Sequence, residues 1–296
     1  MKIVVCLKQV LDTRVPLEVK GTVVQKEPLP VYIISPADRV ALEKALEIKA
    51  ALADVRVTAL TAGPARAEQA LRMALASGAD GAIHLKDDLF EAADAYSVAR
   101  ALGKAIKKLD FDLILCGNRS WDIGAGQVPV FLAEMLCLPR VTGVMKMELL
   151  APARFKLWRR LEKGKRQIVG CSLPAVLAVD TSAGQPRYVS EFSLKKAKEK
   201  PIQTLGLADI GLASAEISPE ASPVKVVSLA PPKPRPKKIF TPGSKVSVSQ
   251  RMSFLLSSVT PAKKESNLLE GATDYLAQQI IEYLTQEGIL PKQAMR

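Results

Sequence analysis

The first half of the chain alternates short apolar runs with segments whose apolar residues recur every three to four positions, and this alternation limits the possible folds. The apolar runs at residues 2–7, 56–61, 81–85 and 111–116 predict buried strands. Strands that alternate with helices predict an α/β fold. We therefore expect a doubly wound, mostly parallel sheet with helices on both faces.

The segments between these runs predict helices. A helix is expected to begin at Pro36, and others to begin near Ala67, before Val98 and at Val128. Each shows an apolar face at helical spacing, for example Ala41, Ala45 and their neighbours in the first of them.

The rhythm changes beyond residue 141. Residues 155–161 and 167–179 predict two strands around a turn at 163–165, which we expect to form an antiparallel addition to the sheet. The sequence from 1 to 212 is therefore predicted to be one α/β domain.

Residues 213–296 are predicted to form a C-terminal arm and a helix. The stretch 231–242 has five prolines in twelve residues, a composition typical of an extended arm. A last helix is expected over 268–286, and its apolar stripe must pack on this domain or on a partner.

Charge is divided unevenly along the chain. Residues 1–150 carry 19 Lys and Arg against 18 Asp and Glu, whereas residues 151–296 carry 23 against 12. A basic half is compatible with nucleic acid, an anionic surface or an acidic protein partner. Aromatic residues make up only 5% and no helix-turn-helix or finger spacing occurs, so a protein partner is favoured over nucleic acid.

Other classes of protein are disfavoured by simple counts. No run of about 18 apolar residues predicts a membrane span, and the chain begins in a strand without a secretory segment. The four cysteines form no CxxC pair, and a single histidine completes no zinc ligand set. Three of the cysteines are expected to be reduced core residues of a cytoplasmic protein.

The carboxyl ends of three predicted strands are candidates for a ligand site, because ligands bind there in doubly wound sheets. These ends are Cys6, Ala62 with Gly63, and Gly117. The last continues as GNRSWDIGAGQ before a helix, and such a loop can present amides to a phosphate. It matches neither G-x-x-x-x-G-K-[ST] nor G-x-G-x-x-G, so an ordinary strand-to-helix turn remains an open alternative.

Catalytic groups are scarce. His84 lies in a strand pattern and is interpreted as structural, and Asp87 with Asp88 as a solvated turn. Asp122 can hold a ribose or a basic group, or cap the following turn. The residues favour a binding or electron-carrying module over a hydrolase.

Ordered segments of the chain resemble the beta subunit of electron transfer flavoproteins. They are KIVVCLKQVLDT, ISPADRVALEKALEIKA, TALTAGPARAEQALRMALASGAD, FDLILCGNRSWDIGAGQVPVFLAEMLCLPRVT, SLPAVLAVD, GQPRYVSEFSLKKAKEKPI and LADIGL. The resemblance covers about residues 1–212, and SPVKVVSLAPP resembles the arm of that family.

The resemblance implies an adenine nucleotide alpha hydrolase-like fold and a heterodimer with an alpha subunit that holds most of one FAD. Electrons would pass from a dehydrogenase through this flavin to a quinone reductase or another acceptor, so the chain would be a carrier subunit rather than a stand-alone enzyme. The beta subunit would itself hold AMP, or a second FAD if the complex is of the bifurcating type.

Carried over by position, the resemblance implies a cofactor site at the strand ends and the glycine loop. Its residues are Cys6, Ser35, Pro36, Ala37, Asp38, Ala62, Gly117, Asn118, Arg119, Ser120, Trp121, Asp122, Ile123, Gly124, Ala125 and Gln127.

Two departures from the family pattern bear on this site. Ser35 stands where the family has asparagine, and Gly124 and Ala125 stand where it has a second acid and a threonine. The lost groups predict weaker phosphate binding, whereas the short loop resembles members with a second FAD. The balance favours a second FAD, and with it bifurcation.

The resemblance also implies a docking segment for a redox partner at residues 191–200. Glu191 occupies the position of the family's leucine anchor, with Phe192, Leu194 and Lys195 beside it. The departure from leucine implies a partner other than a standard acyl-CoA dehydrogenase, and a solvated basic helix is the alternative. For the whole chain, the alternative function is a flavin-free nucleotide-binding protein that resembles universal stress proteins.

Overall fold

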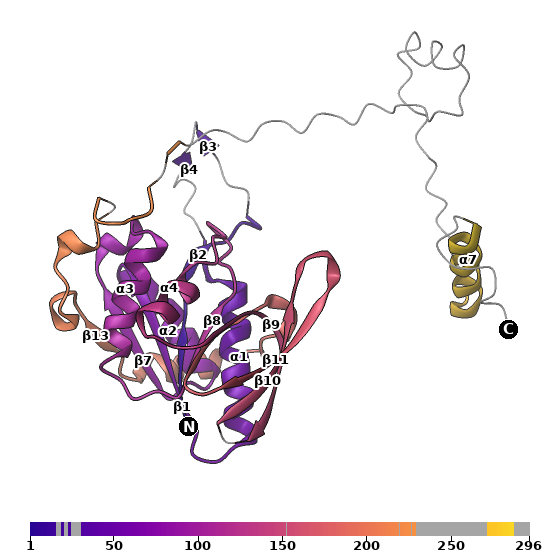
Figure 1. The fold of residues 1–296 in the computed structure, drawn as a ribbon, viewed down its shortest axis with the longest axis horizontal. Coiled ribbons are helices and arrows are strands. Elements are labelled where there is room, and N and C mark those ends of the chain that lie inside the picture. The colour runs from indigo at the N-terminus through magenta and orange to yellow at the C-terminus, as the bar shows by residue number, and fades with distance from the viewer. Residues whose placement is uncertain are drawn as a thin grey trace, which may run out of the picture. The chain divides into compact units, whose positions relative to one another are not determined.

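The computed structural model describes residues 1–15, 19–20, 23–24, 31–151, 153–218, 220–225, 227–228 and 271–286 (Figure 1). The chain divides into two compact units, Met1–Pro232 and Lys233–Arg296. The proline-rich stretch at 231–242, predicted to be an extended arm, lies outside the described residues.

A nine-stranded sheet forms the centre of the first unit, in the order β11-β10-β9-β12-β8-β1-β6-β7-β13 (Figure 1). From that edge the strands are Arg166–Ser172, Arg154–Arg160, Arg140–Ala151, Ala175–Val179, Leu113–Gly117, Lys2–Cys6, Arg56–Gly63, Gly81–Lys86 and Gln203–Leu205. The pairs from β12 to β13 are parallel, and those among β9, β10 and β11 are antiparallel. The predicted α/β fold with a mostly parallel sheet and an antiparallel addition is confirmed.

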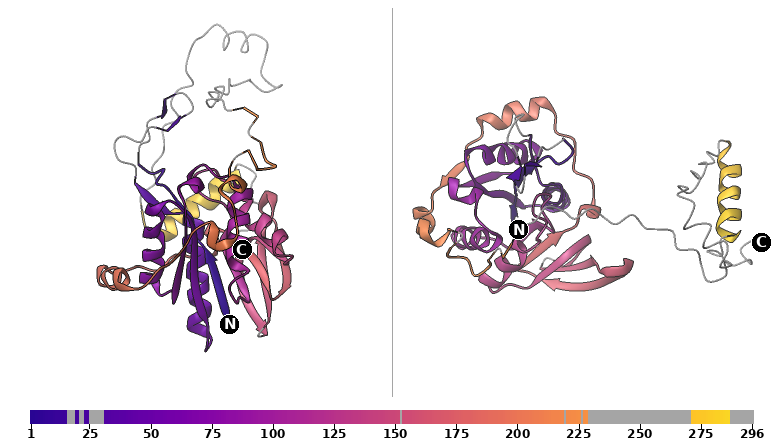
Figure 2. Two further views of the ribbon diagram at one scale, coloured as in Figure 1. Left: turned by 90° about the vertical axis from the view of Figure 1, so that its left-hand side faces the viewer. Right: turned by 90° about the horizontal axis from the view of Figure 1, so that it is seen from above.

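The central parallel strands are largely apolar because helices cover both of their faces. Every residue of β8 and of β12 is buried. Helices α1 (Pro36–Ala51) and α2 (Glu68–Ser77) pack in the hydrophobic core of one face, and α3 (Ala95–Ile106) and α4 (Val128–Met135) in that of the other (Figure 2).

The antiparallel addition differs in detail from the prediction. Residues 167–179, predicted as one strand, divide into β11 and β12 on either side of Leu173 and Pro174. Proline has no amide to continue a ladder, and the all-apolar β12 fits a buried parallel position instead. The prediction of a single antiparallel strand there was therefore wrong.

Two strands of the large sheet were missed from the sequence. In β9 the apolar pattern is interrupted by Gly143, where pairing passes from parallel with β12 to antiparallel with β10. In β13 only three residues pair, with β7, and they show no periodicity. Both are segments in which position in the sheet, rather than local pattern, decides the structure.

The remaining elements are short. Two small antiparallel pairs are formed by β2 (Gln9–Leu11) with β5 (Tyr32–Ile34) and by β3 (Val19–Lys20) with β4 (Val23–Val24). Single turns of 3₁₀ helix occur at Ala65–Ala67, Asp88–Glu91, Glu162–Gly164, Thr181–Ala183, Ala208–Ile210 and Ser214–Glu216. The last two helices are α5 (Glu191–Glu199) and α7 (Thr273–Gln286).

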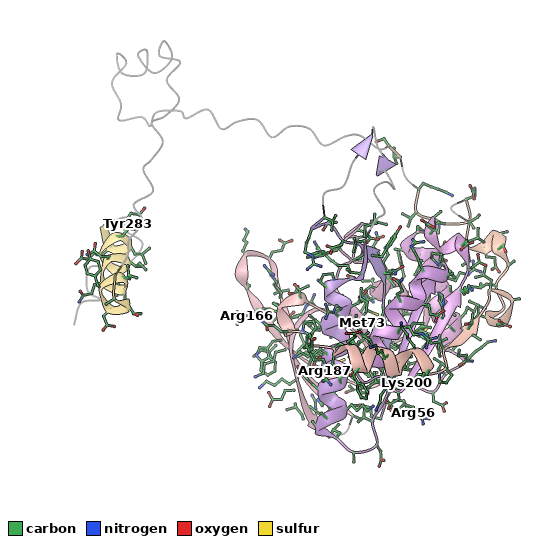
Figure 3. The ribbon with its side chains drawn as sticks, turned by 180° about the vertical axis from the view of Figure 1, so that it is seen from behind. Arg56, Met73, Arg166, Arg187, Lys200 and Tyr283 are labelled. Atoms are coloured by element: carbon green, nitrogen blue, oxygen red, sulfur yellow. The ribbon has the colours of Figure 1, made fainter. Side chains whose placement is uncertain are left out.

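Helix α7 confirms the predicted last helix in part, because the residues before 271 are outside the described ranges. Tyr275, Ile280, Ile281 and Tyr283 on it are exposed large apolar side chains (Tyr283 is labelled in Figure 3). Their packing on a partner stays a prediction.

Cys6, Cys116 and Cys171 are buried free thiols, as predicted, and Cys137 is exposed. Within the described ranges, no helix is long and apolar enough to cross a membrane.

Strand β1 fixes where a ligand is expected. It lies between β6 and β8, and the chain leaves it first toward β6 and β7 and returns to its other side through β8. In doubly wound sheets the crevice for a ligand opens beyond the carboxyl ends of two such strands. The ends of β1 and β8 therefore mark the site.

Candidate functional site

Asp38, in the first turn of α1, joins the ends of β1 and β8. Its Oδ2 accepts a hydrogen bond from the amide of Lys8 and its Oδ1 one from the amide of Gly117, each at 2.8 Å. The residue is only 7% exposed. One buried carboxylate thus holds both strand ends against the start of the helix.

The environment of Asp38 opposes its charge. Burial raises the pKa of Asp38 to about 7, although the amides of Lys8 and Gly117 and the charge of Lys8 act in the opposite direction. The carboxyl group therefore changes its protonation near neutral pH, directly beneath the loop that follows β8.

Glycine is required at two positions of this loop. A Cβ at Gly117 would collide with the Asp38 carboxylate and lie 2.8 Å from the Cβ of Ala37. Gly126 has φ +64°, and a Cβ there would lie 2.9 Å from the carbonyl oxygen of Asn118. Both let the backbone turn closely over the strand end.

Three contacts hold the loop in place. The Nζ of Lys8 pairs with the Asp122 carboxylate at 2.5 Å. Asn118 donates its amide to the carbonyl of Val179 at 2.8 Å, and its Oδ1 accepts from the amide of Gly143 at 3.0 Å. Burial opposes the charge of Asp122, but the hydrogen bond from Lys8 and other contacts lower its pKa overall. Asp122 therefore binds a basic group of the chain itself, one of the roles left open by the sequence.

An open cleft of about 810 Å³ lies between this loop and the tops of β9 and β10. Its lining consists of Ala37, Asn118, Arg119, Ser120, Trp121, Gly124, Gly143, Arg159, Arg160, Leu161, Glu162, Asp180 and Thr181. Trp121 is 41% exposed and the neighbouring Ile123 73% exposed. A cleft of this size, with a few charged groups and exposed apolar side chains, is typical of a cofactor site.

The residues carried over from the resemblance fall into three groups. Those in the cleft are Ala37, Asn118, Arg119, Ser120, Trp121 and Gly124. Buried beneath or beside them are Cys6, Ser35, Asp38 and Gly117. Outside the lining lie Pro36, Ala62, Asp122, Ile123, Ala125 and Gln127, the last at the start of α4.

Two of the buried members have unusual surroundings. The Ser35 hydroxyl is buried and has no hydrogen-bond partner among the described residues. A hydrogen bond with Cys6 and burial raise the pKa of the neighbouring Cys116 thiol well above its usual value, so the Cys116 thiol stays protonated.

The sequence missed several residues of the site. Lys8 follows β1 directly, and its place at a strand end was a usable signal. Arg159, Arg160, Leu161 and Glu162 come from the antiparallel addition, and Gly143, Asp180 and Thr181 from β9 and the end of β12. Nothing local marks these residues, because only the sheet order brings the addition next to the loop.

Other candidate groups behave as the sequence predicted. His84 is buried, its Nε2 lies 3.1 Å from the carbonyl oxygen of Gly63, and burial lowers its pKa. Asp87 caps a turn by accepting from the amide of Leu89. Among the described residues no group of three or more side chains could hold a metal ion. The cleft instead offers amides and guanidinium groups, which suit an anionic ligand.

The predicted docking segment forms α5, held at both ends. Ser190 caps its start by accepting from the amide of Ser193 at 3.2 Å. At its end, Arg72 of α2 donates to the carbonyls of Ala197 and Lys200 at 2.9 and 2.6 Å. Glu191 pairs with Lys195 at 3.3 Å, Lys196 lies over the Phe192 ring, and Leu194 is half-buried. Phe192 is 66% exposed on this fixed helix (Lys200 is labelled in Figure 3).

Comparison with known proteins matches residues 28–210 to the electron transfer flavoprotein domain. The chain belongs to the electron transfer flavoprotein family. It is 37% identical to the electron transfer flavoprotein subunit beta of Thermoanaerobacterium thermosaccharolyticum over 84% of this chain and 95% of that one. It is 33% identical to the subunit beta of Bacillus subtilis over 81% and 91%.

A further relative carries a more specific name. The chain is 35% identical, over 78% of its length and 88% of the relative, to the caffeyl-CoA reductase-Etf complex subunit CarD of Acetobacterium woodii. The predicted membership of the electron transfer flavoprotein family, on the beta-subunit side and with an electron-transfer role, is confirmed by these matches.

Proposed function

We propose that this chain pairs with an electron transfer flavoprotein alpha subunit and that its cleft binds the phosphate-bearing part of FAD or AMP. The observation that carries the proposal is the cleft itself, which is lined by the glycine-rich loop after β8, the strand next to the switch point of the sheet. A bound FAD supplies the electron chemistry, since a flavin accepts and releases electrons. The residues of this chain bind, orient and shield it.

The loop has a defined part in this proposal. Gly117, Gly124 and Gly126 have no side chain to cover the backbone, so the amides between them can approach a phosphate. The Lys8–Asp122 pair fixes the loop from the side of β1. Neither an acid nor a hydroxyl stands at positions 124 and 125, so backbone amides must do most of the binding.

The first experiment counts cofactors. The chain is co-expressed with its candidate alpha subunit, and FAD and AMP are extracted from the purified complex and quantified. We expect a yellow complex with two FAD and no AMP, the arrangement that accompanies bifurcation. One FAD with one AMP would reject the second flavin, and a colourless chain that binds ATP or AMP as a homodimer would favour the stress-protein alternative.

The same proposal gives the C-terminal segment, residues 213–296, the role of binding the alpha subunit. The apolar side chains exposed on α7 support it, because such a stripe is typical of a helix that packs on another surface. Deleting residues 231–296 should sharply weaken association with the alpha subunit, measured by co-purification. Unchanged association would exclude this role.

We further propose that α5 docks a redox partner through Phe192. An exposed aromatic side chain on a helix fixed at both ends can act as an anchor, and such anchors contribute about 2 kcal/mol or more. Phe192→Ala should slow electron exchange with the cognate dehydrogenase by more than tenfold. Ile168→Ala, which truncates an exposed apolar residue on β11, is the matched control and should leave exchange unchanged.

The donor is proposed to be a dehydrogenase and the acceptor a quinone reductase or similar protein, in the cytoplasm. The relative named as part of a caffeyl-CoA reductase complex supports a donor or acceptor that acts on a thioester substrate. Equal exchange rates of the wild type and Phe192→Ala with every candidate partner would exclude α5 as the docking site.

A further inference from the structure

Arg159 lies on β10 of the antiparallel addition, between the buried core residues of that strand and the cleft. It lies two residues after Leu157 and four after Phe155 on this strand, and both of those side chains are buried in the core. Side chains alternate along a strand, so Arg159 continues this inward face at its upper end. There it lines the cleft opposite Asn118 and Ser120.

The guanidinium of Arg159 lacks a counter-charge. Its Nη2 donates to the Oγ1 of Thr142 at 3.2 Å, while its Nε is buried and has no acceptor among the described residues. No carboxylate in the described part of the chain forms an ion pair with it. A partly buried cation without a partner costs free energy, because it has lost water and gained little in return.

Two other arginines of the same unit, by contrast, have carboxylate partners for their guanidinium groups. Arg187 (labelled in Figure 3) binds Glu43 with Nε and Nη2, each at 2.9 Å to a carboxylate oxygen. Arg72 binds Glu68 and three carbonyls of α5. Of these three arginines, Arg159 is the one that lines the cleft, and it has no carboxylate partner among the described residues.

Two carboxylates, Asp180 and the exposed Glu162, also line the cleft, and neither forms an ion pair with Arg159 in the described part of the chain. Asp180 uses Oδ1 to accept from the amide and the hydroxyl of Ser182. Arg119 and Arg160 are exposed and add positive charge at the rim. The donors that converge here therefore fit an anionic group that the ligand must bring.

We infer that Arg159 is the phosphate anchor of the cleft, pairing with a phosphate oxygen of the bound adenine nucleotide or flavin. This inference rests on the proposed function. It assigns to the antiparallel addition a share in binding that the loop after β8 would otherwise carry alone. It also explains how the cleft can hold a phosphate although the loop lacks a second acid and a threonine hydroxyl.

The test compares AMP with adenosine, which differ only in phosphate, and FAD with riboflavin, which lacks both the phosphates and the adenosine of FAD. The full-length chain, in complex with its alpha subunit and freed of bound nucleotide, is titrated calorimetrically with AMP, adenosine, FAD and riboflavin. Arg159→Gln should weaken binding of AMP or FAD by about 10- to 100-fold, the effect of one hydrogen bond to a charged group. Adenosine and riboflavin should bind as they do to the wild type.

Two variants serve as controls. Arg159→Lys keeps the charge and should recover part of the loss. Arg166→Gln, which alters an exposed arginine on β11 (labelled in Figure 3), should bind every ligand as the wild type does. An equal loss for phosphorylated and unphosphorylated ligands in Arg159→Gln would assign Arg159 a structural role and overturn the inference.

Thermal unfolding without ligand separates folding from binding. Replacing an uncompensated buried cation by an apolar residue of similar length should not destabilise the free protein, so Arg159→Met should unfold at or above the wild-type Tm. A Tm several degrees lower would contradict the inference. If the wild type binds none of the four ligands, the proposed function fails together with it; if the wild type and Arg159→Gln bind AMP and FAD equally, only the anchor is lost.

Discussion

The two ends of the parallel sheet each open into a cleft, but their linings differ in kind. The cleft at the carboxyl ends, of about 810 Å³, is lined by glycines, polar loop residues, three arginines and the two acids Glu162 and Asp180. The groove at the amino ends, of about 610 Å³, is lined mainly by apolar residues. They are Met1, Leu52, Ala53, Val55, Leu149, Leu150, Ala151, Ala153, Leu173 and Pro174, with Asp112 as the one charged side chain.

This difference follows from the direction of the strands. At the carboxyl ends the chain turns into helix N-termini, where amides are free and the helix dipole favours an anion. At the amino ends it arrives from helix C-termini, which present carbonyls. One end is therefore suited to bind phosphate, while the lining of the other includes no Lys or Arg side chain. Matched substitutions at the two ends test whether residues at the carboxyl ends cost more stability when they are replaced than residues at the amino ends.

The largest difference is expected between two strand-terminal glycines. Gly117 ends β8 and Gly81 begins β7. Gly117→Ala forces a Cβ into the Asp38 carboxylate and should cost about 3 kcal/mol or more, or prevent folding. Gly81→Ala, whose Cβ would lie 3.7 Å from the Thr58 hydroxyl, should change stability by less than about 1 kcal/mol. Denaturant unfolding measures both, and equal costs would remove the distinction between the ends.

A second matched pair consists of two carboxylates that accept backbone amides. Asp38 holds Lys8 and Gly117 in a buried position, whereas Asp112 accepts from the amide of Lys2 at 2.7 Å in an exposed one. Asp38→Asn leaves one amide facing an NH₂ group and should cost about 1–3 kcal/mol at pH 8. Asp112→Asn should cost less than about 1 kcal/mol, since water replaces the lost acceptor. If Asp112→Asn costs as much stability as Asp38→Asn, burial of the carboxylate is not the cause of the loss.

The pH dependence of stability sharpens the same comparison. Burial raises the pKa of Asp38 to about 7 in the folded state, against an ordinary value of 3.8. Between about pH 4 and 7 the folded chain therefore holds a proton that the unfolded chain has released. The part of the Asp38 contribution that comes from this difference in pKa is complete below pH 4 and is lost as pH rises through 7, whereas the hydrogen bonds to the two amides remain at pH 8.

We therefore expect the stability advantage of the wild type over Asp38→Asn to grow as pH falls from 7 to 4, by at most about 1.4 kcal/mol per pH unit. Thermal unfolding at several pH values measures the difference. A constant difference across this range would mean that Asp38 titrates normally.

The site at the carboxyl ends was predictable from the sequence only where neighbouring residues in the chain identify it. The loop from 117 to 127 was recognised because glycines follow an apolar run, whereas Asp38 was named as a site residue only through the resemblance. The resemblance added the order of these segments. What it could not add is that Asp38 is buried and binds two strand ends, since both partners are backbone amides that no sequence pattern marks.

The other wall of the cleft was not predictable. Arg159 and Arg160 belong to a hairpin whose place beside β9 and β12 depends on sheet order. Residues 167–179 read as one apolar strand, although they form two strands with different partners. Local pattern identifies which residues prefer strands, while long-range pairing determines which wall of a site they form.

The smallest expected effect concerns one ion pair at each end of the sheet. Lys8 and Asp122 lie 2.5 Å apart at the carboxyl ends, and Lys2 and Asp110 lie 2.8 Å apart at the amino ends. The first pair is partly buried, so a double-mutant cycle of Lys8→Met and Asp122→Asn should give a coupling of about 0.5–1 kcal/mol. The second is largely exposed and should show no measurable coupling. Because salt screens exposed charges more than buried ones, the Lys8–Asp122 coupling should persist at 0.5 M NaCl. Equal couplings, or loss of both in salt, would mean that this pair does not order the loop, and that the loop depends on Asn118 and its glycines alone.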